Sequence, residues 1–178
     1  MNSAYVYLQL YKLFDKVTPL KVDCGKLCER ACCKGDDCGM YLFPGERKVF
    51  NMLRPNWGYI ENSDFSYTYN SKQKSVPIIF CSGNCDRYQR PLACRIFPLT
   101  PYIDETGTLK IITDPRAKAL CPLAKTLDIS EYDRGFLKNV KRAFDILATN
   151  DEVYTFLDTY SRQLDEYLKF YNSKGGLL

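Results

Sequence analysis

Cysteine is the residue type in this chain that is best suited to chemistry. The 178-residue sequence contains nine cysteines and no histidine. Without histidine there is no imidazole to act as an acid or base, to activate a nucleophile or to bind a metal. Thiolate sulfur is a strong ligand for zinc and for iron–sulfur clusters. The composition therefore predicts a metal site built from cysteine sulfur, with carboxylate as the other available ligand type.

The first group of cysteines has the spacing Cys24-x3-Cys28-x3-Cys32-Cys33. Residues three or four apart on a helix or a tight turn face the same side, so these thiols can reach a single metal centre. Two adjacent residues would be strained if both bound one ion. We therefore expect one of Cys32 and Cys33 to be a ligand, while the other packs or serves a second centre. Cys38 follows two aspartates, and the sequence leaves open whether it is a ligand or a free thiol.

The second group has the spacing Cys81-x3-Cys85-x8-Cys94, with a Gly-Asn turn at residues 83–84 that could cradle a cluster. Three arginines alternate with these cysteines: Arg87, Arg90 and Arg95. A nearby cation lowers the pKa of a thiol and favours the thiolate that binds metal. Pairing with surface carboxylates is the alternative role for these arginines. For Arg95, which directly follows Cys94, we expect a position near the cluster sulfurs or a carboxylate beside them.

The candidate metal ligands are Cys24, Cys28, Cys32, Cys33, Cys81, Cys85, Cys94 and Cys121. Of these, Cys24, Cys28, Cys85 and Cys94 are the expected core ligands. Four thiolates suit zinc and a 4Fe–4S cluster equally well by count. The sequence does not decide between the two metals, or between one centre and two.

The composition also bears on partners and location. The net charge of +4 is small and is spread along the chain, so no nucleic-acid partner is expected. The first twelve residues lack the basic start and apolar stretch of a secretory signal, and no run approaches the roughly 18 apolar residues of a membrane span. We therefore expect a cytoplasmic protein with no membrane partner. Reduced thiols in that compartment favour metal binding over disulfides.

Several elements can be predicted around the cysteines. Apolar spacing predicts a helix within residues 3–17, and residues 43–46 start a second helix that ends at residues 54–56. Residues 57–81 are expected to be extended, with residues 66–69 and 76–80 rich in β-branched and aromatic side chains and a turn at residues 70–72 between them. A β-hairpin is predicted for residues 99–103 and 108–113.

The C-terminal third is predicted to form two helices. Residues 130–133 and 149–152 resemble capping boxes, and each precedes a stripe of apolar residues at helical spacing. We expect this stripe to be buried in a helical layer beside the cysteine region, at Phe144, Leu147, Leu157 and Leu164. The predicted fold is α+β: a single small domain, residues 1–178, with an N-terminal helix, cysteine-rich loops, a few short antiparallel strands and a C-terminal helical hairpin.

Two segments carry a family resemblance. Residues 24–33, CGKLCERACC, and residues 85–98, CDRYQRPLACRIFP, resemble the cysteine-cluster family named for a CxxCxxCC signature and thought to chelate zinc or iron. Cys81 and Cys121 also stand where members of that family often carry cysteine. The first gaps contain three residues here rather than two. The resemblance implies metal chelation, and a similar cysteine region occurs in the longer flagellin lysine N-methylases.

The expected function is that of a metal-binding protein holding an iron–sulfur cluster or zinc in an accessory, sensing or electron-transfer role. The alternative is an S-adenosylmethionine-dependent protein-lysine N-methyltransferase with a cysteine-bound cluster, an analogy drawn from the resemblance alone. A structural zinc module that presents the C-terminal helices to a protein partner is a third reading. The sequence assigns no catalytic residue and no binding site for an organic cofactor.

Overall fold

The computed structural model describes residues 3–33, 39–83 and 85–173, so Cys38 lies outside the described residues. The α-helices are α1 (Ser3–Lys12), α2 (Cys24–Leu27), α3 (Arg47–Leu53), α4 (Leu92–Ile96), α5 (Pro122–Thr126), α6 (Arg134–Leu147) and α7 (Asp151–Ser173). The strands are β1 (Gly39–Tyr41), β2 (Gly58–Tyr69), β3 (Lys72–Cys81), β4 (Leu99–Ile103) and β5 (Leu109–Thr113). Short 3-10 turns lie at Ala31–Cys33, Arg87–Gln89, Pro115–Ala119 and Ile129–Glu131. The predicted α+β class is confirmed.

The longest strands, β2 and β3, form an antiparallel hairpin around a two-residue turn. Both turn residues, Asn70 and Ser71, have positive φ angles, of 50° and 58°. Such a turn matches the natural twist of a hairpin, which is why a short polar turn suffices here. Both strands lie within residues 57–81, which the sequence predicts to be extended. β1, which was not predicted, pairs with the other edge of β3 to complete a three-stranded sheet.

The second hairpin, β4–β5, forms as predicted, with residues 104–108 as its loop. The Asp104 carboxylate accepts hydrogen bonds from the backbone N–H groups of Thr106 and Thr108, both at 2.9 Å. Gly107 has a φ of 78°, a conformation that favours glycine. Among the described residues, no helix is both long and apolar enough to cross a membrane.

The two C-terminal helices bury their apolar stripes, as predicted. Phe144, Leu147, Leu157 and Leu164 are at most 4% exposed. The helix starts differ from the prediction by one to three residues. The Asp133 side chain accepts a backbone hydrogen bond from the first turn of α6, and the Asn150 side chain accepts one from the first turn of α7. A capping side chain directly precedes the first helical residue, so these two residues mark where the helices begin.

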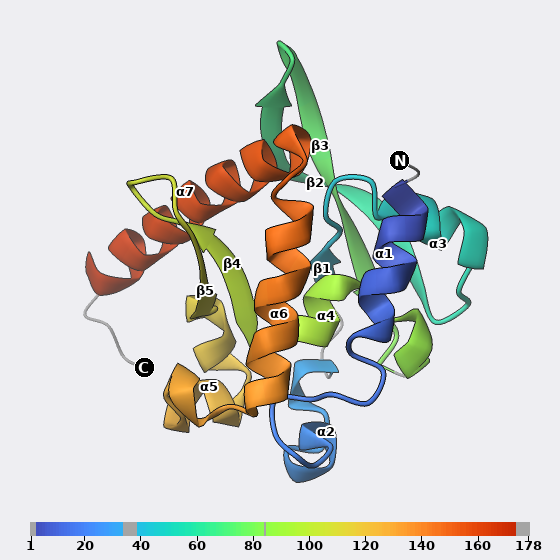
Figure 1. Ribbon diagram of the computed structural model, residues 1–178, viewed down its shortest axis with the longest axis vertical. Helices are drawn as coiled ribbons and strands as arrows, with labels where there is room; N and C mark the ends of the chain where they lie inside the picture. The colour runs from blue at the N-terminus through green and yellow to red at the C-terminus, as the bar shows by residue number, and fades with distance from the viewer. Residues whose placement is uncertain (1–2, 34–38, 84, 174–178) are drawn as a thin grey trace.

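The first and last thirds of the chain pack against each other. α1 ends at Lys12, earlier than the predicted residue 17, and Phe14 follows in a turn. The rings of Phe14 and Phe136 lie edge to face at 6.3 Å, and those of Phe43 and Phe144 at 5.1 Å. In Figure 1, the β2–β3 hairpin extends from one end of the molecule, and α2 and α5 lie at the opposite end.

Candidate metal centre

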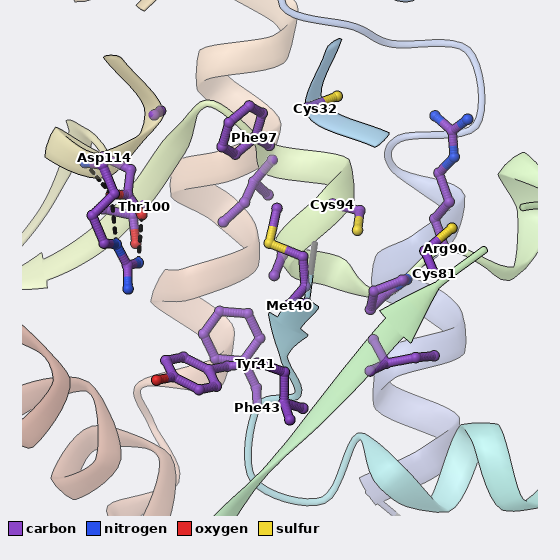
Figure 2. A pocket seen from close by; sticks show the side chains of 18 of the residues that line it. Cys32, Met40, Tyr41, Phe43, Cys81, Arg90, Cys94, Phe97, Thr100 and Asp114 are labelled. Carbon is purple, nitrogen blue, oxygen red and sulfur yellow. Dashed lines mark hydrogen bonds and ion pairs between the residues drawn. The ribbon is translucent and has the colours of Figure 1, made fainter. Parts of the chain in front are cut away.

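Five thiols line one end of a cavity of about 330 Å³. They come from three separate parts of the chain: Cys32 and Cys33, Cys81 and Cys85, and Cys94. Figure 2 shows Cys32, Cys81 and Cys94 on one side of the cavity and Asp114 and Thr100 on the other, with Met40 between them. The eight described cysteines are all free thiols. The fold thus brings part of the first cysteine group, Cys32 and Cys33, together with the whole of the second group around one space.

Close backbone packing places Cys81 at the end of β3. Cys81 pairs with Gly58 of β2, and a Cβ atom on Gly58 would lie 2.2 Å from the Phe80 carbonyl oxygen. Glycine is therefore required at residue 58 for the two strands to pair this tightly. The pairing fixes the point at which the chain leaves the sheet and begins the loop that carries Cys85.

A buried carboxylate, Glu46, fixes the helix that carries Cys94. Glu46 is 0% exposed, and its Oε1 atom accepts hydrogen bonds from the Tyr11 hydroxyl at 2.6 Å and from the backbone N–H of Leu92 at 2.7 Å. Its Oε2 atom accepts from the backbone N–H of Phe43 at 3.0 Å. Because Leu92 is the first residue of α4, Glu46 joins α1, the chain before α3 and the start of α4. The sequence indicated Glu46 only as part of a helix start.

Replacing Glu46 by glutamine is expected to destabilise the protein by about 1–3 kcal/mol, because an amide nitrogen would leave one buried N–H or O–H donor without an acceptor. Chemical denaturation measures the loss. Glu61→Gln, an exposed position on β2, is the matched control. An equal effect of the two substitutions would show that the three hydrogen bonds contribute nothing measurable.

The effect of Glu46→Gln on stability is also expected to depend on pH. Burial raises the pKa of the Glu46 carboxyl above its ordinary value of 4.5, although three hydrogen-bond donors oppose the shift. The folded protein therefore binds this proton more tightly than the unfolded chain does. The resulting stability is complete below pH 4.5 and is lost as the pH rises through the folded-state pKa. The advantage of the wild type over Glu46→Gln should thus be largest in acid and should shrink toward neutral pH.

The thiols at the cavity act on one another. A hydrogen bond with Cys33 and burial raise the pKa of Cys85, and Arg90 opposes that shift. Burial and the nearby thiols of Cys85 and Cys33 raise the pKa of Cys94. A hydrogen bond between Cys32 and Cys33 raises the pKa of Cys33 to about 11. Burial and hydrogen bonds between the thiols thus favour their neutral forms, and a bound cation would favour the thiolates.

Backbone N–H groups also point at a sulfur of this group. Burial raises the pKa of Cys81, while the N–H groups of Gly83 and Cys85 hydrogen-bond to its sulfur and oppose the shift. Gly83 has a φ of 85°, which turns the chain back toward the sulfur. Hydrogen bonds of this kind stabilise a metal-bound thiolate and tune the potential of a cluster.

Arg90 and Arg95 have different contacts, which the sequence only partly indicated. The Nε atom of Arg90 donates to the Cys85 sulfur at 3.1 Å. Arg95 is 7% exposed and pairs with the Asp15 carboxylate at 3.3 Å, so it is not free in solvent. It contacts main chain rather than sulfur: its guanidinium donates to the carbonyls of Tyr88 and Arg90, both at 2.8 Å. Arg95 therefore stabilises the loop from which the Arg90 side chain reaches the Cys85 sulfur.

Arg90→Gln is expected to weaken metal binding by about 10–100-fold, the usual effect of removing a group that hydrogen-bonds to a ligand. Arg90→Lys keeps the charge but not the planar Nε–H donor, and should fall between the wild type and glutamine. Competition with a chelator of known affinity measures both. Equal metal affinities of the wild type and the two variants would show that Arg90 does not contribute to the site.

The remaining predicted ligands lie elsewhere. Of the expected core ligands, Cys85 and Cys94 line the cavity, whereas Cys24 and Cys28 do not, and neither does Cys121. Within the described residues, no three cysteine, aspartate or glutamate side chains are gathered closely enough to hold one metal ion as they stand. No family model, curated protein or solved structure matches this chain.

The end of the cavity away from the sulfurs is polar. Arg116 makes two hydrogen bonds to the Asp114 carboxylate, at 3.0 and 2.6 Å, and a third to the Tyr160 hydroxyl. Asp114 is 7% exposed. Apolar walls that include Met40 and Phe97 separate this group from the thiols. These residues were not predicted, because Asp114 and Arg116 lie at the 3-10 turn Pro115–Ala119, whereas Tyr160 on α7 is 44 positions further along the chain.

Proposed function

We propose that this chain is a metal-binding protein and that Cys33, Cys81, Cys85 and Cys94 hold an iron–sulfur cluster. The observation that carries the proposal is the convergence of these four thiols, from three separate segments, on one end of a cavity with Arg90 beside them. Buried apolar cysteines would not require a cation or backbone N–H groups directed at their sulfurs. The family resemblance at residues 24–33 and 85–98 points to the same chemistry.

The cavity beside the thiols favours a cluster over a single ion. Zinc binds four sulfurs at about 2.3 Å each and needs no further space. A cluster adds iron and sulfide between thiolates that bind different iron atoms. The cavity of about 330 Å³ next to the thiols offers room for those atoms. The positive charge of Arg90 and the N–H groups of Gly83 and Cys85 would offset the negative charge of a four-thiolate cluster.

Anaerobic purification tests the proposal directly. A cluster gives a brown protein that contains iron and acid-labile sulfide in equal amounts, whereas zinc gives a colourless one. Cys94→Ser should abolish the colour. Ala93→Ser, the neighbouring residue on α4, keeps the thiol and serves as the matched control. A colourless wild-type protein that carries zinc would replace the cluster by a zinc site, and a metal-free protein would refute the proposal.

The half-buried positions of the four cysteines suit an electron-transfer, sensing or accessory role. Each is partly exposed, so the centre would lie near enough to the surface to exchange electrons with a protein partner. Electron paramagnetic resonance of the reduced protein tests this role. If no reductant or oxidant changes the oxidation state of the cluster, only a structural function remains for it.

The polar end of the cavity supports a second candidate, an S-adenosylmethionine-dependent methyltransferase with a bound cluster. The cavity continues from the sulfurs past apolar walls to Asp114 and Arg116, which gives an organic molecule both surface to contact and polar groups to bind. Titration calorimetry with S-adenosylmethionine tests it. Absence of binding to the metal-loaded protein would rule this candidate out.

A further inference from the structure

Hydrogen bonds fix the position of Arg116 at the polar end of the cavity. The Oδ1 atom of Asp114 accepts from the Arg116 backbone N–H at 2.9 Å and from the Arg116 Nε at 3.0 Å. Its Oδ2 atom accepts from the Arg116 Nη2 at 2.6 Å and from the Tyr160 hydroxyl at 3.5 Å. The guanidinium also lies over the Tyr160 ring, 5.2 Å from its centre. The Arg116 side chain is therefore held in one orientation before any ligand binds.

One donor group of Arg116 is still open. Its Nε and Nη2 atoms donate to Asp114 and Tyr160, whereas its Nη1 atom makes no hydrogen bond to any residue that the structure describes. Arg116 lines the cavity, and its side chain is 36% exposed. A guanidinium carries two N–H groups on Nη1. A molecule in the cavity can therefore find hydrogen-bond donors there that the protein itself does not use.

The charges at this end favour a neutral ligand. Each Asp114 oxygen already accepts two hydrogen bonds, so a cationic group finds no free acceptor there. The charge of Arg116 is already neutralised by Asp114, so an anionic group would add an unpaired charge beside a buried carboxylate, which is costly. A carbonyl oxygen accepts a hydrogen bond and adds no charge. The polar end therefore suits a neutral hydrogen-bond acceptor.

The walls of the cavity suit a flat apolar body. Figure 2 shows Phe97 on one side of the cavity and Tyr41 on the opposite side, with Met40 between them. Phe156 and Tyr160 also line the cavity, and their rings stack with centres 5.8 Å apart. Aromatic rings offer faces and edges to another aromatic ring, and a methionine side chain adapts its shape to what it contacts. An aromatic molecule therefore has matching surface here.

We propose that the cavity binds a small, neutral aromatic carbonyl compound. Its carbonyl oxygen accepts a hydrogen bond from the Nη1 atom of Arg116, and its ring contacts Met40, Tyr41 and Phe97. This ligand differs from S-adenosylmethionine, which carries an amine, a carboxylate and a sulfonium charge. The site gives the chain a small-molecule binding function in addition to metal binding. Because none of these residues is a proposed metal ligand, either proposal can fail while the other stands.

Three probes with the same naphthalene ring test the ligand class on the wild-type protein. 2-Acetonaphthone carries a neutral carbonyl, 2-naphthoate a carboxylate and 2-ethylnaphthalene no polar group. Nuclear magnetic resonance of protein labelled with carbon-13 at the methionine methyl groups follows their binding, with and without a chelator. 2-Acetonaphthone should shift the signal of Met40 in the cavity and not that of Met52, which is 64% exposed on α3. It should bind about tenfold more tightly than the other two probes, the usual effect of one hydrogen bond from a charged donor.

Tighter binding of 2-naphthoate or of S-adenosylmethionine would overturn the neutral ligand, and no shift of the Met40 signal with any probe would overturn the site. Equal binding of 2-ethylnaphthalene and 2-acetonaphthone would show that the carbonyl has no partner in the protein.

Arg116→Lys tests the hydrogen bond itself, because lysine keeps the charge beside Asp114 but has no Nη1 atom. It should weaken the binding of 2-acetonaphthone about tenfold and leave that of 2-ethylnaphthalene unchanged. Lys118→Arg, at an exposed position of the same 3-10 turn, is the matched control. Unchanged binding of 2-acetonaphthone by folded Arg116→Lys would refute the role of Arg116. The probe series on the wild type decides the proposal if this variant does not fold.

Discussion

Removing the proposed metal with a chelator is expected to make the amide hydrogens of residues 20–33 and 85–94 exchange rapidly, while α6 and α7 keep their protection. No residue between 20 and 33 is fully buried, so little apolar packing holds that segment in place. Metal-binding free energy becomes folding free energy where a site forms only in the folded state, and for structural zinc it is on the order of 10 kcal/mol. Helices α6 and α7 contain eleven buried residues and need no metal.

Hydrogen exchange followed by mass spectrometry, with and without chelator, measures this difference along the chain. Cys94→Ser should reproduce the chelated pattern near α4 without any chelator, and Ala93→Ser should not. Uniform loss of protection, including α6 and α7, would mean that the metal and the apolar core form one cooperative unit. Unchanged exchange in residues 20–33 would mean that metal does not order this segment.

Leu157→Asp is expected to unfold the protein. Leu157 is 0% exposed in the middle of α7. Truncating a buried leucine to alanine already costs about 2–5 kcal/mol, and aspartate adds a buried carboxylate without a partner. The total approaches the whole stability of an ordinary domain, about 5–15 kcal/mol. Circular dichroism and thermal denaturation should show little or no folded protein.

Leu168→Asp is the matched control, because it makes the same change on the same helix at a residue that is 38% exposed. We expect a near-normal melting temperature for this variant. If Leu157→Asp stays folded and changes only its oligomeric state, the stripe on α7 is an interface between chains rather than part of the core.

Local patterns predicted much of the fold. The β4–β5 hairpin and the two C-terminal helices were predicted because each carries its own turn or apolar periodicity. β1 was missed because a three-residue strand has no periodicity of its own and exists only through its pairing with β3. The extended conformation of residues 57–81 was predicted from their β-branched and aromatic residues, and β2 and β3 lie within that range.

The candidate site was predictable as a set of residue types but not as an arrangement. Spacing identified the cysteines, and the arginines beside them suggested charge compensation. The packing of α4, β3 and the first cysteine segment decides which thiols lie together. That packing cannot be predicted from the sequence pattern. The same limit hid Glu46, whose three hydrogen-bond donors come from residues 3 to 46 positions away in the chain.

The contacts between the first and last thirds of the chain also bear on when a metal could be inserted. Phe14 and Phe43 pack on Phe136 and Phe144, which are synthesised more than 90 residues later. During translation, all the cysteines therefore leave the ribosome before the helices that complete the core around them. The proposed metal would accordingly meet a complete core only after Phe136 and Phe144 on α6 have been synthesised.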